Sequence, residues 1–258
     1  MSILLNELSG GVRTLTLNRP ERRNALSAEL VDALREAVEQ AATCAETRVI
    51  VLTGAGDKVF CSGADLNPMA AAQGPYVMHE GRRGFVELLR AFRRSGRPVV
   101  VKLNGHVLAG GVGLLAAADL AVAADDVEVS TPELKVGLFP MMIMALIARN
   151  VGRKHALELL MTAGKFSAAR AAEMGLINRV VPRDQLDAAV QDLAGTLAGF
   201  SPAVMKLGRD AFYAMEDMPL DGALDYLCNQ LTINTLTEDA AEGVMAFVSK
   251  RPPEWKGR

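Results

Sequence analysis

The stretch NGHVLAGGVG, residues 104–113, directly follows an apolar run over residues 98–103 that is typical of a buried strand. A second glycine-rich stretch, FCSGADL at residues 60–66, comes shortly after another such run over residues 49–53. Either stretch alone could be an ordinary strand-to-helix turn, but both place small residues where main-chain N–H groups can lie bare beside a ligand. Two such groups that converge on one carbonyl oxygen form an oxyanion hole, which stabilises charge that develops there during a reaction. The pair therefore predicts an oxyanion hole.

A lone carboxylate, Glu133, follows on a short turn after the apolar segment 128–130. A single glutamate usually lies in solvent. Here the neighbouring Leu134, Phe139 and Met141 would bury the carboxylate in part, and burial raises the pKa of a carboxyl group. A raised pKa would suit general acid/base catalysis.

These three segments, in this order and at these spacings, resemble the crotonase (enoyl-CoA hydratase/isomerase) superfamily. The resemblance covers nearly the whole chain, from LNRPERRNAL at residues 17–26 to FVSKRPPEW at residues 247–255. It implies that the N–H groups of Ala64 and Gly110 hold the oxygen of an acyl thioester of coenzyme A. It also implies that Glu133 is a general acid/base at the α or γ carbon. No prosthetic group is implied, since coenzyme A enters as part of the substrate.

The order of the predicted elements favours an α/β fold. Strands alternate with helices up to about residue 181, which is typical of stacked units around a mostly parallel sheet, and amphipathic helices follow. The resemblance implies a crotonase-like spiral of stacked ββα units with a C-terminal helical region for trimerisation. We therefore expect a core that holds the acyl-CoA site over residues 1–195 and a helical region for assembly over residues 196–258. The expected assembly is a homotrimer or a dimer of trimers.

Two local signals concern individual helices. Ser27 is expected to cap a helix that runs to about Cys44, because apolar residues recur there at helical spacing. The polar residues 67–84 are expected to form a mobile loop, followed by a helix over residues 85–92.

The resemblance also assigns the groups that contact the substrate. The positions that match the family's coenzyme A contacts are Arg22, Arg23, Ala25, Leu26, Lys58, Ala64, Asp65, Leu66, Phe247 and Lys250. The last two sometimes reach a neighbouring subunit's site in that family. Phe139, Met141 and Met142 are candidates for the acyl pocket, because methionines form a deformable apolar wall. From the residues alone, the cations also suit an exposed face, the methionines suit a core, and Asp65 suits a bond to its own turn.

One position departs from the pattern of hydratases with two carboxylates. Those enzymes carry a second glutamate three residues after the oxyanion glycine, where this chain has Gly113. A single carboxylate suits a proton shuttle between C2 and C4 of the acyl chain, as in Δ3–Δ2 isomerisation, and can also activate water for hydration of a 2-enoyl thioester. His106, Asp119 or the segment 67–97 could supply a second group.

Other classes of protein were weighed against an enoyl-CoA enzyme. A non-catalytic acyl-CoA-binding protein and a CoA-thioester hydrolase both stay open, since each needs no more than these groups. A dinucleotide-binding enzyme is suggested by Gly54-Ala55-Gly56 after a strand. That interpretation fails because no third glycine and no helix follow at the required spacing.

Composition narrows the class further. The net charge of −2 gives no general attraction to nucleic acid or to an anionic membrane, so neither is expected as a partner. No run approaches ~18 consecutive apolar residues, so no membrane span is predicted. Cys44, Cys61 and Cys228 are scattered, show no metal-ligand spacing with the histidines, and are expected to be free thiols. Because a basic, apolar leader is also missing, we expect a cytoplasmic protein without a metal site.

Overall fold

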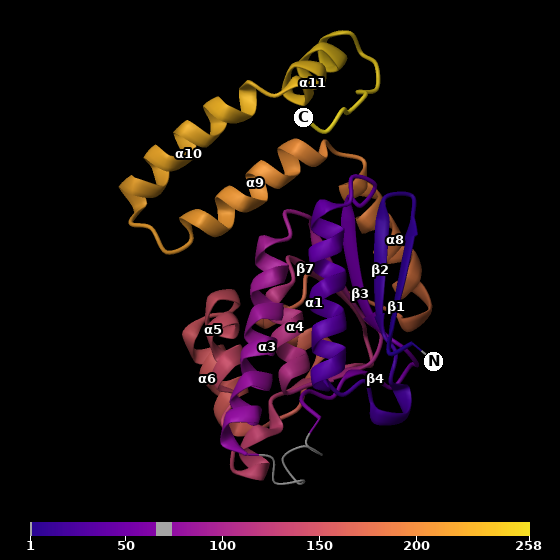
Figure 1. Cartoon of the computed structure of the whole chain (residues 1–258), viewed down its shortest axis with the longest axis vertical. Coiled ribbons are helices and arrows are strands. Elements are labelled where there is room, and N and C mark those ends of the chain that lie inside the picture. Colours follow the sequence, from indigo (N-terminus) through magenta and orange to yellow (C-terminus); the bar gives the residue numbers. More distant parts are fainter. Residues whose placement is uncertain (1, 66–73) are drawn as a thin grey trace.

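A computed structural model describes residues 2–65 and 74–258, and two sheets organise them (Figure 1). The larger sheet has the strand order β1-β2-β3-β5-β7-β10. Its strands are β1 (Leu4–Ser9), β2 (Val12–Leu17), β3 (Val49–Gly54), β5 (Val99–Leu103), β7 (Leu120–Ala124) and β10 (Arg179–Val181). β1 and β2 are antiparallel, and the other pairs of this sheet are parallel. Every residue of β3 is buried, as expected for a parallel strand that is covered on both faces.

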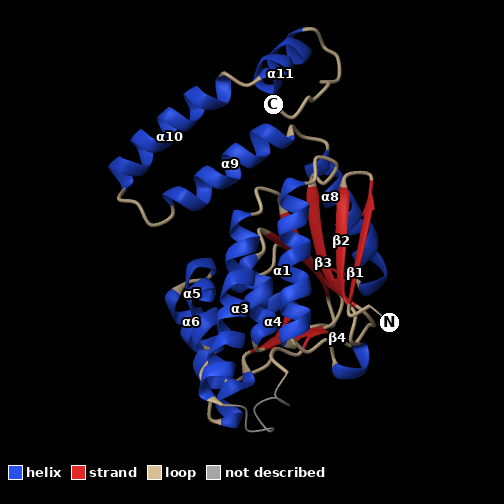
Figure 2. Cartoon of the chain, viewed as in Figure 1, coloured by secondary structure: helices blue, strands red, loops and turns tan. Residues whose placement is uncertain are grey.

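The smaller sheet contains strands from both glycine-rich stretches that are predicted to bind the substrate. Its strands, in the order β4-β6-β8-β9, are β4 (Val59–Cys61), β6 (His106–Leu108), β8 (Glu128–Ser130) and β9 (Phe166–Ser167). Figure 2 shows helices beside the strands of the larger sheet. In the middle of the chain, two successive units each add one strand to the larger sheet, one strand to the smaller sheet and then a helix. These units are β5-β6-α4 (Gly110–Ala117) and β7-β8 followed by α5 (Met141–Asn150), whereas β1 and β2 both belong to the larger sheet. This repeat is the ββα unit that the sequence predicts.

Helices cover the larger sheet and fill the space between repeats. They are α1 (Ala28–Thr43), α3 (Pro75–Arg94), α4 (Gly110–Ala117), α5 (Met141–Asn150), α6 (Arg153–Thr162), α7 (Ala168–Met174) and α8 (Leu186–Ala198), with short 3-10 turns η1 (Pro20–Arg22), η2 (Pro132–Val136) and η3 (Arg183–Gln185). Ser27 caps α1 as predicted, because its Oγ accepts the N–H of Leu30 at 3.3 Å. Within the described residues, no helix is long and apolar enough to cross a membrane.

The expected loop before residue 85 is wrong over its last ten residues. α3 begins at Pro75, whose fixed φ suits the first position of a helix. Only the second half of α3 packs into the core, through Phe85, Leu88 and Phe92. The first turns are exposed, with Tyr76 and Val77 open to solvent. No large apolar residue follows between Met78 and Phe85, so the sequence there lacks the apolar periodicity that would have revealed the helix.

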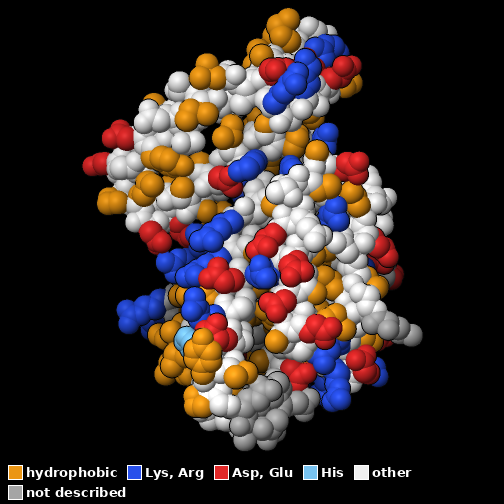
Figure 3. Space-filling model, in the orientation of Figure 1, with side chains coloured by type: hydrophobic (Ala, Val, Ile, Leu, Met, Phe, Trp, Pro, Cys, Tyr) orange, Lys and Arg blue, Asp and Glu red, His pale blue; other side chains and the backbone are white. Residues whose placement is uncertain are grey.

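Three helices at the end of the chain project from this body (Figure 1). They are α9 (Pro202–Met215), α10 (Leu220–Thr235) and α11 (Glu238–Val248). The predicted division after residue 195 falls inside α8, before this projection. Many large apolar side chains of these helices are exposed (Figure 3), among them Leu220, Leu224, Leu231, Leu236, Val244, Phe247 and Val248.

A buried ion pair fixes α9 to the core. Arg209 is 6% exposed, and its guanidinium donates to Asp119 Oδ2 at 2.8 Å and to the carbonyl oxygens of Phe92 and Arg93. The Tyr213 hydroxyl donates to the other oxygen of Asp119 at 2.5 Å. Asp119 also accepts the N–H of Val99, so this carboxylate joins the start of β5 to α9.

Removing this pair is expected to destabilise the protein strongly. Arg209→Met should lower the free energy of unfolding by about 3–5 kcal/mol, because it leaves Asp119 without its charged partner in a largely buried place. Lys206→Met on the same helix is the control, since the exposed Lys206–Asp210 pair contributes at most about 0.5 kcal/mol. Urea denaturation at one protein concentration measures both, and equal effects of the two changes would contradict this role for Arg209.

Candidate active site

The two glycine-rich turns come into direct contact. Gly63 lies in the left-handed region at φ +88°, and a Cβ placed on it would be 2.5 Å from Ala109 Cβ and 2.9 Å from Gly110 N. Only glycine permits both this conformation and this close approach. The first turn therefore packs main chain against main chain on the second.

This contact brings together the two N–H groups that the sequence predicts. A Cβ on Gly110 would be 3.7 Å from Ala64 N. Ala64 forms an isolated parallel bridge with Leu26, which uses Gly63 O and Asp65 N. The N–H of Ala64 itself consequently points away from Leu26, on an exposed residue.

Gly110 supplies the second N–H group. It is the first residue of α4, where N–H groups have no partner inside the helix and the helix dipole favours negative charge. The preceding Ala109 has φ +50°, which is unusual for a residue with a side chain and marks a turn that its surroundings hold in place. Its own N–H donates to Ser130 O at 2.9 Å.

That last bond also places the candidate acid/base. β6 and β8 are parallel neighbours, so the chain leaves Ser130 beside the second turn and enters η2, which carries Glu133. Burial raises the pKa of Glu133 above its ordinary value, as the sequence analysis expects. Its Oε2 is buried and, among the described residues, accepts no hydrogen bond. A half-buried carboxylate with a free acceptor oxygen is suited to take up a proton.

No second carboxylate can stand at residue 113. A Cβ on Gly113 would lie 2.3 Å from Ile143 Cγ2 and 3.3 Å from Phe85 Cζ. Asp119 cannot replace it, because it lies at the opposite end of α4, about 12 Å along the helix from Gly110, and is bonded to Arg209. His106 Nδ1 accepts the N–H of Glu128 at 3.0 Å.

A thiol also lies against the second turn. The Sγ of Cys61 is 3.1 Å from where a Cβ of Gly111 would be. Burial raises the pKa of the Cys61 thiol to about 12, so it stays protonated at neutral pH and is a poor nucleophile. Across the described chain, no three His, Cys, Asp or Glu side chains gather to hold a metal ion.

The structure brings together only some of the predicted coenzyme A contacts. Arg23 and Lys58 line one hollow of about 940 Å³. Its other charged groups are the cations of Lys165 and Arg183 and the carboxylates of Glu21, Asp57, Asp126 and Glu128. Arg22 is exposed outside that lining. Asp65 accepts a hydrogen bond from Arg19 at 3.2 Å, and Leu66 lies outside the described residues.

Ala25 and Leu26 use their main chain within the protein. The carbonyl of Ala25 accepts from Arg19, and both main-chain groups of Leu26 bond to the first turn. Phe247 and Lys250 lie at the end of α11, at the opposite end of the molecule from β4 (Figure 1). They can reach the site only in a second copy of the chain.

The candidate pocket residues sit at the start of α5. Phe139 packs partly against the core, whereas Met141 and Met142 are 64% and 38% exposed. Ile143 of the same helix packs beside Gly113 of α4, although it was not among the site residues predicted from the sequence. The sequence feature that could have indicated Ile143 is its spacing of four residues from Ile147, which places both on one face of the helix. Both side chains are buried.

Comparison with known proteins decides the family. The family model described as "Enoyl-CoA hydratase/isomerase" matches residues 7–258. The chain belongs to the enoyl-CoA hydratase/isomerase family.

Within the enoyl-CoA hydratase/isomerase family, the chain is similar to proteins whose names differ in the activity they give. It is 37% identical over 247 residues to the rat protein named enoyl-CoA hydratase domain-containing protein 3, mitochondrial, covering 95% of this chain and 81% of that one. It is 33% identical over 261 residues to the 2,3-dehydroadipyl-CoA hydratase of Escherichia coli, with both chains fully covered. The solved enoyl-CoA hydratase of Mycobacterium smegmatis superposes with a TM-score of 0.95 at 35% identity, over 99% of each chain. The crotonase fold predicted from the sequence is thereby confirmed.

Proposed function

We propose that this protein acts on enoyl thioesters of coenzyme A, with Glu133 as its single acid/base. The N–H groups of Ala64 and Gly110 bind the thioester oxygen and stabilise the enolate that forms when a proton leaves C2. Glu133 takes that proton and returns it to C4, so that a C3–C4 double bond moves to C2–C3. Proton number and electron count are unchanged, and no further reactant is needed.

The observation that carries this proposal is the closed space at Gly113. Ile143 and Phe85 occupy the volume that a side chain there would need. Addition of water is easiest when two carboxylates hold one water molecule, whereas a proton shuttle along the acyl chain needs one. We therefore infer that the double-bond shift is the faster reaction.

Hydration of a 2-enoyl thioester is the second candidate. It is favoured by the names of relatives, which include the hydratase of Escherichia coli and the carnitinyl-CoA dehydratase of Salmonella typhi, 32% identical to this chain. Assays with 3-hexenoyl-CoA and 2-hexenoyl-CoA separate the two, because the first reaction creates conjugated-enoyl absorbance and the second removes it. If absorbance is lost from 2-hexenoyl-CoA faster than it is gained from 3-hexenoyl-CoA, hydration is the main reaction and the preference for isomerisation is wrong. If the protein binds these thioesters but catalyses neither reaction, it is a non-catalytic acyl-CoA-binding protein.

The rate should depend on the protonation of Glu133. Only the ionised carboxylate can accept the C2 proton, and burial raises its pKa above the ordinary 4.5. The acid limb of the kcat/KM profile is therefore expected at a midpoint above pH 4.5, with activity rising as the pH rises through it. Initial rates from pH 4 to 8 test this, and a midpoint at or below 4.5 would contradict it.

We also propose that the C-terminal helices assemble copies of the chain into a trimer or a dimer of trimers. The exposed apolar side chains on α10 and α11 support this proposal, because contiguous apolar surface is normally covered. Phe247 and Lys250 would then reach a neighbouring copy's hollow beside Arg23 and Lys58. Sedimentation should show an oligomer at micromolar concentration, and a stable monomer would refute the assembly.

A further inference from the structure

The loop that precedes α1 holds an unusual backbone. Arg23 and Asn24 are consecutive residues at φ +53°, in the left-handed region, although neither is glycine. Asn24 is fully buried. Its Oδ1 accepts the N–H of Arg19 at 3.0 Å, and its Nδ2 donates to the carbonyls of Ala55 and Val59 at 3.0 and 2.8 Å. The amide side chain therefore ties the loop to the β3–β4 connection and fixes the place of Arg19.

Arg19 continues the link toward the first turn. Its Nη1 donates to Ala25 O at 2.7 Å, and its Nη2 donates to Asp65 Oδ2 at 3.2 Å. The side chain of Arg19 is 17% exposed and that of Asp65 is 12% exposed. A charge so far removed from water is screened less than a surface charge.

The hydrogen bonds then pass through two peptide units. Ala25 O belongs to the same planar peptide as the N–H of Leu26, which donates to Gly63 O at 2.8 Å. Gly63 O belongs to the same peptide as the N–H of Ala64. In a planar trans peptide the C=O and N–H bonds point in opposite directions. Holding Gly63 O from the Leu26 side therefore aims the N–H of Ala64 away from Leu26.

We propose that Arg19 is a positioning residue of the oxyanion hole, acting through the peptides 25–26 and 63–64. Its cation polarises the first peptide, which makes the N–H of Leu26 a stronger donor, and that bond polarises the second peptide in the same sense. The result is an Ala64 N–H that is both fixed in direction and strengthened as a donor. The proposal rests on the proposed function, because it assumes that a thioester oxygen binds there.

The test measures the C=O stretching frequency of a bound thioester, which reports the strength of the N–H donors rather than the stability of the fold. Butanoyl-CoA with a ¹³C-labelled thioester carbonyl is bound at saturation, and its C=O stretch is measured by infrared difference spectroscopy. Strong donors lower this frequency on binding. Arg19→Gln keeps a donor for Ala25 O but removes the charge, and it should lose at least half of the shift seen with the unmodified protein. Its kcat for the enoyl shift should fall about tenfold or more, with KM changed less than about threefold.

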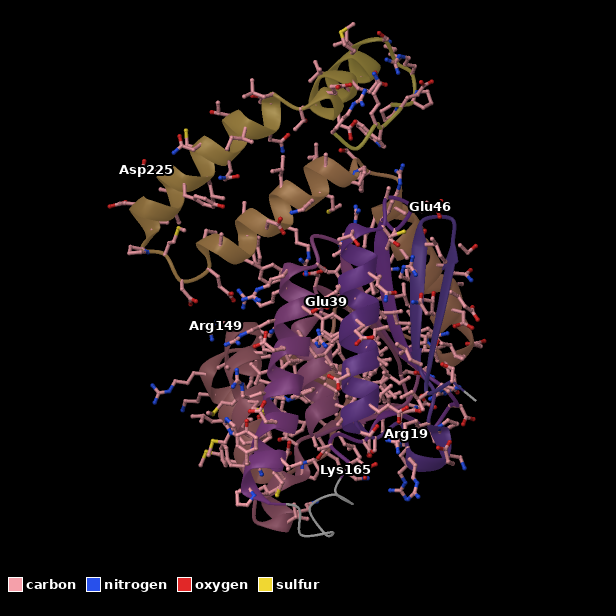
Figure 4. The ribbon with its side chains drawn as sticks, in the orientation of Figure 1. Arg19, Glu39, Glu46, Arg149, Lys165 and Asp225 are labelled. Atoms are coloured by element: carbon pink, nitrogen blue, oxygen red, sulfur yellow. The ribbon has the colours of Figure 1, made fainter. Side chains whose placement is uncertain are left out.

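Two further variants complete the design. Arg149 also donates to one carbonyl, Ala145 O, and to one carboxylate, Asp217, and lies well away from Arg19 (Figure 4). Arg149→Gln should therefore leave the shift and kcat unchanged. Arg19→Lys keeps the charge but replaces the two guanidinium nitrogens, each of which bonds one acceptor, by a single nitrogen, so its shift should lie between those of Arg19→Gln and the unmodified protein.

The outcomes are distinguishable. If the unmodified protein binds no butanoyl-CoA, or binds it without a shift, the proposed function is wrong. If the unmodified protein shows the shift and Arg19→Gln shows it equally, the role of Arg19 is wrong while the proposed function stands. Should Arg19→Gln not fold, a full shift in Arg19→Lys would overturn the role in the same way.

Discussion

Glu133→Gln is expected to lower kcat for the enoyl-CoA reaction by about 10²–10⁴, the usual contribution of a positioned proton-transfer group. Glutamine has nearly the same shape but cannot accept the C2 proton. Affinity for a saturated acyl-CoA should change less than about threefold, because Glu133 is not placed among the coenzyme A contacts. Steady-state kinetics and titration with butanoyl-CoA measure the two quantities separately.

A glutamate outside the site provides the control for this change. Glu39 on α1 forms an exposed pair with Arg35 at 3.0 Å, so Glu39→Gln should leave kcat within about twofold. The melting temperature of the Glu133 variant should not fall, since burial of the charged carboxylate opposes folding at neutral pH. Full activity in Glu133→Gln would remove Glu133 from the mechanism.

Gly110→Pro is expected to lower kcat by about 10²–10³, the usual effect of removing one oxyanion donor. Proline lacks the N–H group and is well tolerated at the first position of a helix, which Gly110 occupies in α4. Proline also constrains the residue before it, and Ala109 is held at φ +50°. The melting temperature of the variant is therefore measured beside its kcat, and an unchanged melting temperature assigns the loss to the missing donor.

Gly110→Ala is the matched control for that change. It keeps the N–H group, and its Cβ would meet Leu26 Cδ1 at 3.5 Å and Gly63 Cα at 3.6 Å, which are ordinary contacts. Its kcat should fall less than about tenfold, and circular dichroism should show both variants folded. Equal losses in the two variants would mean that space, and not the N–H group, matters at Gly110.

The parts of this structure that the sequence predicts depend on local signals. The buried runs at β3 and β5, the cap at Ser27 and the glycine at 63 each follow from side-chain size and backbone freedom over a few residues. The raised pKa of Glu133 agrees with the sequence-based expectation, although Leu134 and Met141, which were expected to bury the carboxylate, are 41% and 64% exposed. Membership of the family, which the comparisons establish, follows from the order of these segments.

What the sequence does not predict depends on contacts between distant segments. The exposed start of α3 carries no apolar periodicity, so its beginning at Pro75 could not be foreseen. Ile143 closes the space at Gly113 from thirty residues away, and the bond from Arg19 to Asp65 spans 46 residues. Such pairings appear only when the fold brings the segments together.

The proposed reaction depends on an enolate held by the N–H groups of Ala64 and Gly110 while Glu133 moves the proton. Exchange of the C2 protons of butanoyl-CoA in D₂O, followed by proton NMR, measures removal of the C2 proton alone, because this saturated thioester has no double bond to shift or hydrate. The protein should replace these protons with deuterium, and Glu133→Gln should slow the exchange at least about a hundredfold. Exchange no faster than in buffer alone, or equally fast in Glu133→Gln, would contradict the account.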